Sequence, residues 1–553
     1  MDRRRFLRQS GWLTGVALVP VFSGCGSSTD PAGLEPPADG PAAFNHGVAS
    51  GDPLSDRVIL WTRVTPAQDG PVAVRYQVAT DPALQAIVAD EVVMTTAERD
   101  YTVKVDPAGL QPGTTYYYRF SVGETRSPVG RTKTLPVGSV DRLRFAFTSC
   151  SNYPAGYFST YRHMAARQDL DAVFHLGDFL YESGSSGSLE RAHFPDHEIV
   201  SLTDYRQRHA QYKTDPDLQA LQRQHPMICV WDDHESTNDS WSDGAQNHTE
   251  GDEGVWLERK ATAIQAYFEW MPIRVVDPND DQRIWRQFTF GDLVDLLMLD
   301  TRLYGRDEQL PTPPLNSQDL NDPSRQLLGG VQEAWLAGRL ATTSARWKIL
   351  GQQVMFGQLR LASLPDLSVL GLTLAEELLA LNADQWDGYP AARDRVFNMI
   401  EANGLDDVIV LTGDIHSSWG MELYRDPGDL LTLLDNIVGD PVDLGLIKGL
   451  GVEFVTPSVT SSGFPAGTTP LLQAAFNLVD PHIKYFEGEQ HGYVLLDMTH
   501  ERTQGEWWYV DSITDPASGE YYATGLFTRS GENHLRRAEA PTEARPDAPV
   551  LAP

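Results

Sequence analysis

The chain has 553 residues, with 44 Lys and Arg against 76 Asp and Glu, which gives a formal net charge of −32. This length predicts more than one domain, and a hydrophobic content of 41% excludes a wholly disordered chain. So acidic a chain argues against nucleic acid as a partner, because the phosphates would be repelled. The 3 cysteines are too few for a disulfide scaffold.

The first 24 residues have the layout of an export signal. Three arginines, Arg3 to Arg5, precede a short apolar run at 11–22 and then the small residues before Cys25. This order is typical of secretory signals, and the run is too short to span a bilayer comfortably. The arginines and the following Phe-Leu resemble a twin-arginine signal, and the residues before Cys25 resemble a lipobox. We therefore expect removal of residues 1–24, export in a folded state by the twin-arginine machinery, and a periplasmic or cell-surface protein with a possible lipid anchor at Cys25. An uncleaved N-terminal membrane anchor is the alternative.

A linker and a β domain come next. Residues 25–43 are rich in Ser, Pro, Gly and Ala, which predicts a flexible tether. Within 44–137, stretches such as 72–78 alternate with period two, as strands do. The turn before the aromatic run 116–122 resembles the late part of an immunoglobulin- or fibronectin III-like sandwich. We predict an all-β domain over 44–137 with no chemistry of its own.

Residues 141–515 follow an α/β pattern. Short apolar runs end in polar residues, and helical stretches such as 157–167 and 256–267 separate them. Buried strands with polar residues at their carboxyl ends are how α/β sheets build sites. The apolar runs are 143–147, 172–176, 227–231, 293–299 and 408–411. Residues 516–553 are predicted to be a C-terminal extension whose last fifteen residues are disordered.

Carboxylates follow three of these strands, within Gly177-Asp178-x-x-Tyr181, Asp232-Asp233-His234-Glu235 and Gly413-Asp414-x-His416. A single motif of this kind is weak evidence, because buried strands often end in Asp for turn or capping reasons. Together, however, the acids would repel one another and raise each other's pKa values unless a cation lay between them. A metal site is therefore the leading interpretation.

As a set, these motifs resemble the PhoD-like alkaline phosphatase/phosphodiesterase family of the metallophosphoesterase superfamily. The set is Thr-Ser-Cys-Ser at 148–151, Gly-Asp-Phe-Leu-Tyr at 177–181, Trp-Asp-Asp-His-Glu at 231–235, Leu-Asp-Thr-Arg at 299–302 and Gly-Asp-Ile-His-Ser-Ser-Trp at 413–419. The broader superfamily has Asn before His-Glu and His after the last Gly, where this chain has Asp233 and Asp414. The resemblance implies an α/β catalytic domain built as a metallophosphoesterase-type β-sandwich flanked by helices, in four αββα layers.

The resemblance also implies a site with one ferric ion and calcium that hydrolyses phosphomonoesters and phosphodiesters by metal-activated hydroxide. It implies that Cys150 and Tyr181 ligate iron and that Asp178 bridges two metals. Arg302 would clamp the phosphate and His234 would protonate the leaving group. Further implied ligands, not assigned to one ion, are Asp232, Asp233, Asn238, Asp414 and His416, with Asn238 also a candidate catalytic residue.

The donor types agree with this assignment. A thiolate and a phenolate suit a trivalent iron, whereas Ca²⁺ prefers carboxylate and amide oxygens. The expected substrate is a phosphate ester, either a small molecule or a diester of a phospholipid or wall polymer.

Other interpretations stay open. The chain could be a calcium-stabilised surface lipoprotein that binds through its sandwich domain without catalysis, although such a site has no use for a thiolate, a phenolate or an imidazole. Cys150 could instead be a nucleophile with His234 as its base, a reading that predicts inactivation by alkylation and indifference to chelators. Arg302 could pair with a structural acid, and Cys229 is expected to be a core residue.

Overall fold

The computed structural model describes residues 43–553 except 185, 186, 188, 190, 312–317, 360–382, 430–431 and 433–446. The predicted export signal, the lipid anchor at Cys25 and nearly all of the predicted linker lie outside the described residues. None of the described helices is long and apolar enough to cross a membrane.

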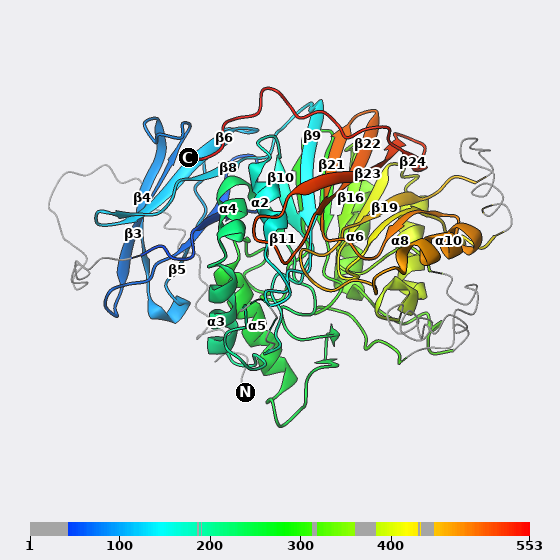
Figure 1. Ribbon diagram of the computed structural model, residues 1–553, viewed down its shortest axis with the longest axis horizontal. Helices are drawn as coiled ribbons and strands as arrows, with labels where there is room; N and C mark the ends of the chain where they lie inside the picture. The colour runs from blue at the N-terminus through cyan, green and yellow to red at the C-terminus, as the bar shows by residue number, and fades with distance from the viewer. Residues whose placement is uncertain are drawn as a thin grey trace.

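Two large sheets form the body of the molecule (Figure 1). The first has 10 strands in the spatial order β24 (Arg536–Arg537), β23 (Glu520–Arg529), β22 (Arg502–Val510), β21 (Gly492–Thr499), β9 (Arg142–Thr148), β10 (Ala172–His175), β11 (Pro226–Cys229), β1 (Val48–Gly51), β2 (Ile59–Arg63) and β5 (Thr102–Val105). The second has 7 strands in the order β14 (Arg286–Phe290), β15 (Val294–Met298), β16 (Trp347–Gly351), β17 (Val408–Thr412), β19 (Gly451–Val455), β18 (Ser418–Leu423) and β20 (Ile483–Glu487).

The remaining strands and the helices surround these sheets. A 5-stranded sheet contains β4 (Ile87–Thr95), β3 (Val72–Ala79), β6 (Thr115–Val122), β7 (Thr125–Arg126) and β8 (Gly130–Lys133), and a short hairpin contains β12 (Ser240–Trp241) and β13 (Gly244–Ala245). The described α-helices are α2 (Ser159–Ala166), α3 (Leu202–Tyr212), α4 (Pro216–Gln224), α5 (Trp256–Trp270), α6 (Gly329–Thr342), α8 (Pro390–Ala402) and α10 (Thr469–Val479). Two 3₁₀ turns lie at η1 (Ala97–Arg99) and η4 (Trp386–Gly388).

The two large sheets bury their inner faces against each other. The rings of Phe145 on β9 and Phe290 on β14 meet edge to face with centroids 4.9 Å apart, and Phe454 on β19 lies 5.8 Å from Trp507 on β22. Alternate residues of the smaller sheet face outward, so that Leu297 belongs to a second core shared with α6 and α8. Burial on both faces explains why these strands read as continuous apolar runs in the sequence.

The strand predictions are confirmed. The apolar runs beginning at 143, 172, 227, 293 and 408 form β9, β10, β11, β15 and β17, and the runs 72–78 and 116–122 form β3 and β6. The predicted helices 157–167 and 256–267 appear as α2 and α5. The mixed α/β class is therefore as the sequence indicated. Cys150 and Cys229 are both buried and free, so no disulfide joins them.

The N-terminal strands are divided between two sheets. Strands β1, β2 and β5 continue the 10-stranded sheet, because β1 pairs in parallel with β11 through Ser50 and Pro226. The inner side chains of these strands pack against β3 and β6 in one cluster that includes Leu60, Val74 and Phe120. The region 44–137 therefore shares a sheet with the α/β region, a pairing across about 175 residues of chain that local patterning does not reveal.

The prediction of a disordered tail is wrong for the residues near the C-terminus. The Tyr117 hydroxyl donates to the carbonyl of Val550 at 2.6 Å, and Gln224 exchanges two hydrogen bonds with the backbone of Ala552 at 2.8 and 3.0 Å. Figure 1 shows the C-terminus beside β6. The Ala- and Pro-rich tail has no core of its own, but side chains of two distant segments satisfy its backbone groups.

Candidate metal centre

The predicted site residues follow parallel strands of both sheets. Strands β9, β10 and β11 are parallel neighbours in the larger sheet, and β15, β16 and β17 are parallel neighbours in the smaller one. Because parallel strands present their carboxyl ends at one edge, the segments after them converge. A hydrogen bond from Arg302, after β15, to Asp232, after β11, joins the two edges.

The backbone turns sharply at the residues expected to bind metal. Cys150, Asp178, Asp414 and His416 have φ values of 61°, 52°, 59° and 55°, in the left-handed region that side chains other than glycine seldom adopt. Such conformations cluster at functional sites, where the surrounding structure holds them.

Glycines before the acids allow close approach. A Cβ on Gly177 would lie 2.3 Å from the Cβ of Asp232, and a Cβ on Gly413 would lie 2.8 Å from that of Ser149. The Gly-Asp pairs in the two motifs therefore let neighbouring strand ends meet.

The ligand atoms form three linked groups. Within each group, one ligand atom per residue lies within 4.8 Å of the others, and the groups are Cys150 with Asp178 and His416, Asp178 with Asp233 and His234, and Asp232 with Asp233 and Asp414. Asp178 belongs to the first two groups and Asp233 to the last two. Shared carboxylates of this kind suit neighbouring cations bridged by one side chain.

Tyr181 joins the first group. Its hydroxyl donates to Asp178 Oδ2 at 2.9 Å, lies 3.1 Å from His416 Nε2, and accepts from Ser461 Oγ at 2.6 Å. The second nitrogen of His416, Nδ1, lies 3.0 Å from the carbonyl oxygen of Ser462. Backbone and hydroxyl contacts therefore orient both side chains toward Asp178.

Three carboxylate oxygens of the centre are buried without a hydrogen-bond partner among the described residues. They are Asp178 Oδ1, Asp232 Oδ2 and Asp233 Oδ1. An unpaired buried carboxylate oxygen is costly and needs an explanation. Bound cations supply one, so the residues present fit a metal centre.

The carboxyl groups of the centre shift one another's pKa values. Burial raises the pKa of Asp414 to about 6, with the carboxylate of Asp384 adding to the shift and Arg302 opposing it. Burial also raises the pKa of Asp232 well above its usual range, and the charges of Asp414 and Asp233 reinforce it. Although burial alone would raise it, the pKa of Asp233 is lowered by Arg302 and His234. The centre therefore holds more negative charge than its own protein cations balance.

Burial also raises the pKa of the Cys150 thiol and of the Tyr181 phenol well above their usual values, and the charge of Asp178 adds to both shifts. Without a cation both groups would keep their protons at neutral pH. A coordinated metal ion of high charge would remove them, since metal binding deprotonates a thiol.

Arg302, the expected phosphate clamp, contacts carboxylates of the centre in this structure. Its fully buried guanidinium donates from Nε to Asp232, from Nη1 to Asp384 at 2.7 Å and from Nη2 to Asp414 at 2.6 Å. Each of the three guanidinium nitrogens therefore already donates a hydrogen bond to a carboxylate. Two of these carboxylates, those of Asp232 and Asp414, belong to the candidate metal groups, and the role of Arg302 as a phosphate clamp stays a prediction.

His234 is held by a carboxylate that the sequence did not single out. Its Nδ1 lies 2.6 Å from Glu182 Oε2, and its ring packs on Tyr181 with centroids 4.1 Å apart. Burial lowers the pKa of His234, but Glu182 and Asp178 together outweigh burial and raise it well above the ordinary value. His234 remains 17% exposed, so its ring is fixed and still reachable.

Asn238 lies beside this pair. Its backbone N–H donates to Glu182 Oε1 at 2.9 Å, and its side-chain amide donates to Gln246 at 3.0 Å. Its predicted role as a ligand or catalytic residue stays a prediction.

Further residues support the centre through hydrogen bonds. Glu235 accepts the backbone N–H groups of Asp178, Phe179 and Asp232 at 3.0, 2.6 and 2.7 Å, which locks the two acid loops together. Gln385 donates to Asp414 Oδ2 at 2.7 Å. The position of Glu235 in the Asp-Asp-His-Glu run could have indicated its role, whereas Glu182 and Gln385 stand in no motif.

An α/β fold with carboxylates, a thiol and imidazoles converging at the strand ends of two sheets defines a candidate multi-cation hydrolase. Residues 145–507 match the PhoD-like phosphatase family, and residues 29–136 match the PhoD-like phosphatase N-terminal domain. The chain is 35% identical over 565 residues to alkaline phosphatase D of Bacillus subtilis (strain 168), an alignment that covers 98% of this chain and 90% of that protein. The solved structure of PhoD superimposes with a TM-score of 0.78 at 35% identity and covers 90% of this chain and 92% of the other.

The chain belongs to the PhoD-like phosphatase family, and it is a hydrolase of phosphoric esters. This membership confirms the family that the motifs resembled.

Proposed function

We propose that the protein is an exported phosphoesterase that cleaves phosphomonoesters or phosphodiesters at a mixed iron and calcium centre. The observation that carries the proposal is the set of three buried carboxylate oxygens, on Asp178, Asp232 and Asp233, that have no hydrogen-bond partner in the described part of the chain. They lie in linked groups of donors that bound cations would satisfy together. We also interpret the face-to-face sheets with their outer helices as the four-layer αββα arrangement, and the N-terminal sheets as an immunoglobulin-like sandwich fused to it.

The donor chemistry divides the centre. Cys150, Tyr181 and His416 gather around one side of Asp178, and thiolate, phenolate and imidazole donors suit iron(III). Asp232, Asp233 and Asp414 offer oxygens alone, which suit calcium, with Asn238 a further candidate ligand. Asp178 would bridge the two kinds of ion. When bound, the cations would acidify a water molecule and offset charge on the phosphoryl oxygens.

The chain's own residues complete the reaction. A water molecule gives up a proton to bulk solvent as its oxygen forms a bond to phosphorus opposite the ester oxygen, and the P–O bond to the leaving group breaks. The leaving oxygen takes its proton from Nε2 of His234, the nitrogen not engaged by Glu182. Glu182 holds Nδ1 and, together with Asp178, raises the pKa of His234, which favours the protonated form that a proton donor needs. Arg302 keeps Asp232 and Asp414 at a fixed separation.

Elemental analysis with visible spectroscopy tests the centre. Purified protein is expected to carry about one iron and one or two calcium ions per chain, together with a charge-transfer band from tyrosinate or thiolate to iron(III). The band should change in Tyr181→Phe and in Cys150→Ser, each of which removes one donor. Protein that hydrolyses esters without either metal, or a band that both variants leave unchanged, would contradict the assignment.

Two other functions are less consistent with these contacts. The Cys150 thiol is fully buried with a raised pKa, and its ligand group contains His416 rather than the proposed base His234, so a nucleophilic thiolate is disfavoured. Loss of activity on chelation and resistance to alkylation would separate the two mechanisms. A calcium-stabilised lipoprotein without catalysis conflicts with membership of a phosphatase family.

Export is tested separately. The double variant Arg3→Lys/Arg4→Lys is expected to leave the protein in the cytoplasmic fraction, since the twin-arginine route depends on that pair. Export of the variant at the wild-type level would contradict the proposed route. Release of Cys25 as a diacylglyceryl peptide on mass spectrometry would support the lipid anchor.

A further inference from the structure

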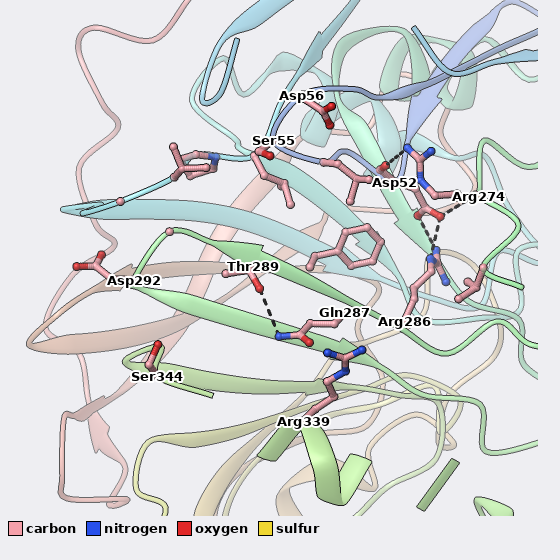
Figure 2. Close-up of a pocket in the computed structure, with 18 of the residues that line it drawn as sticks. Asp52, Ser55, Asp56, Arg274, Arg286, Gln287, Thr289, Asp292, Arg339 and Ser344 are labelled. Atoms are coloured by element: carbon pink, nitrogen blue, oxygen red, sulfur yellow. Dashed lines mark hydrogen bonds and ion pairs between the residues drawn. The ribbon is translucent and has the colours of Figure 1, made fainter. Parts of the chain in front are cut away.

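A cavity of about 790 Å³ lies apart from the metal centre (Figure 2). One wall is formed by N-terminal segments at 52–56 and 135–138, and the opposite wall by the edge strand β14 with side chains of α6. The residues that line it are distinct from those of the metal centre. Its volume is in the range of small-molecule sites, typically about 300–1,000 Å³.

The walls combine apolar surface with polar groups. Leu54 and Leu135 contribute apolar surface from the N-terminal segments, and Phe288 and Trp335 do so from the opposite wall. Figure 2 shows Arg339 of α6 directed toward Gln287 of β14. A ligand that fills the cavity would therefore touch both walls with an apolar body.

The acids that line the cavity already have partners. Asp52 accepts from the backbone N–H of Arg274 at 2.7 Å and from Nε and Nη2 of Arg286 at 2.8 and 2.7 Å. Asp56 pairs with Arg57, and Asp292 accepts the backbone N–H of Val140 at 2.9 Å. Asp52 and Asp56 are thus each paired with an arginine, and Asp292 lies 3.5 Å from Nε2 of His500.

Two arginines of the cavity have no carboxylate partner among the described residues. Arg283 lies over the Trp285 ring at 5.3 Å and Arg339 lies over Trp335 at 5.9 Å, but neither forms an ion pair with a described acid. Nε of Arg283 and Nε of Arg274 are also buried without an acceptor. These two nitrogens could donate to an acceptor held in the cavity.

We propose that this cavity binds a small organic anion, namely a sulfonate, carboxylate or phosphate group attached to an apolar or aromatic body. The surplus guanidinium groups of Arg283 and Arg339 would receive the anionic group, and the apolar walls would receive the body. Because the chain as a whole has a net charge of −32, its overall charge repels anions. Attraction of an anion to this cavity would therefore come from the two arginines themselves. This site goes beyond the proposed function and does not depend on it.

Fluorescence titration with anilinonaphthalene sulfonate tests the proposal, with neutral N-phenylnaphthylamine as the matched probe that lacks the anionic group. The sulfonate is expected to bind, and Arg283→Gln/Arg339→Gln is expected to weaken it about tenfold or more. Arg339→Gln alone, at an exposed helix position, is expected to weaken it about threefold. The control Arg126→Gln/Arg537→Gln removes two exposed arginines elsewhere and should leave affinity unchanged.

Ester hydrolysis provides the check on folding, since neither cavity arginine touches the metal centre and both variants should keep wild-type rates. Sulfonate binding of equal strength in the wild type and the double variant would overturn the proposal. So would neutral probe binding as tight as that of the sulfonate, because the cavity would then recognise apolar surface alone.

Discussion

Removal of Arg302 gives the most direct test of how charge is balanced in the centre. In Arg302→Met the side chain keeps a similar volume, but Asp232 and Asp414 each lose a charge-assisted hydrogen bond, while Asp384 keeps one from Arg306. Breaking a buried ion pair by removing one partner typically costs about 3–5 kcal/mol. With an unfolding entropy of roughly 2.1 cal/mol/K per residue, that cost corresponds to a fall of about 3–4 °C in melting temperature.

The assay is differential scanning fluorimetry of chelated protein, repeated with excess Ca²⁺. Added calcium should raise the melting temperature of Arg302→Met more than that of the wild type, because bound cations take over the neutralisation of the same carboxylates. The matched control is Arg425→Met, whose exposed pairs with Asp394 and Glu401 should change the melting temperature by less than about 1 °C. Equal melting of Arg302→Met and wild type after chelation, or a deficit that calcium does not reduce, would refute the reasoning.

Three further predictions concern the centre and the core. Asp178→Ala should lower the hydrolysis rate of a chromogenic phosphodiester by about a thousandfold or more with cooperative unfolding retained, whereas the exposed control Asp406→Ala should keep its activity; an active Asp178→Ala would exclude the bridging role. Glu182→Gln should lower kcat about 10–100-fold with little change in KM and move the alkaline limb of the kcat profile to lower pH, because the pKa of His234 falls; an unmoved limb would count against Glu182 as the positioning residue. Burial lowers the pKa of Lys213 from 10.5 to about 7, so its charge costs stability fully below pH 7 and less as the pH rises toward 10.5. Lys213→Met should therefore raise the melting temperature at pH 6 by about 1–3 °C and by less at pH 9, and equal effects at both values would contradict this account.

The sequence indicated most of the strands that carry the centre, for a physical reason. Strands such as β10 and β17 are buried on both faces and therefore read as short apolar runs, and each ends at a Gly-Asp pair. The tight approach at Gly177 explains the pair itself, since a side chain there would collide with Asp232. The Gly-Asp motif and the end of the buried strand therefore have the same cause, which is the close packing of neighbouring strand ends.

The partners of these residues were beyond prediction from local patterns. Glu182 directly follows Tyr181 in the chain, yet its contact with His234 lies across 52 residues of sequence. Arg302 was expected to face substrate because arginine suits phosphate, but its contacts with acids of both sheets depend on how the sheets pack. Asp384 and Gln385 reach the centre from a segment that carries no motif.

The sequence alone determined the chemistry of this protein, because the donor types and their spacing are local properties: a thiol, a phenol, imidazoles and carboxylates after buried strands. Tertiary structure alone decided how these groups combine. It joined β1 to β11, which merged the N-terminal strands with the larger sheet, and it placed Arg302 among carboxylates rather than toward solvent. It also tied the tail to Gln224 and placed Arg283 and Arg339 on the lining of a separate cavity. Each of these outcomes rests on contacts between residues far apart in the chain, whose energies depend on packing rather than on any single segment.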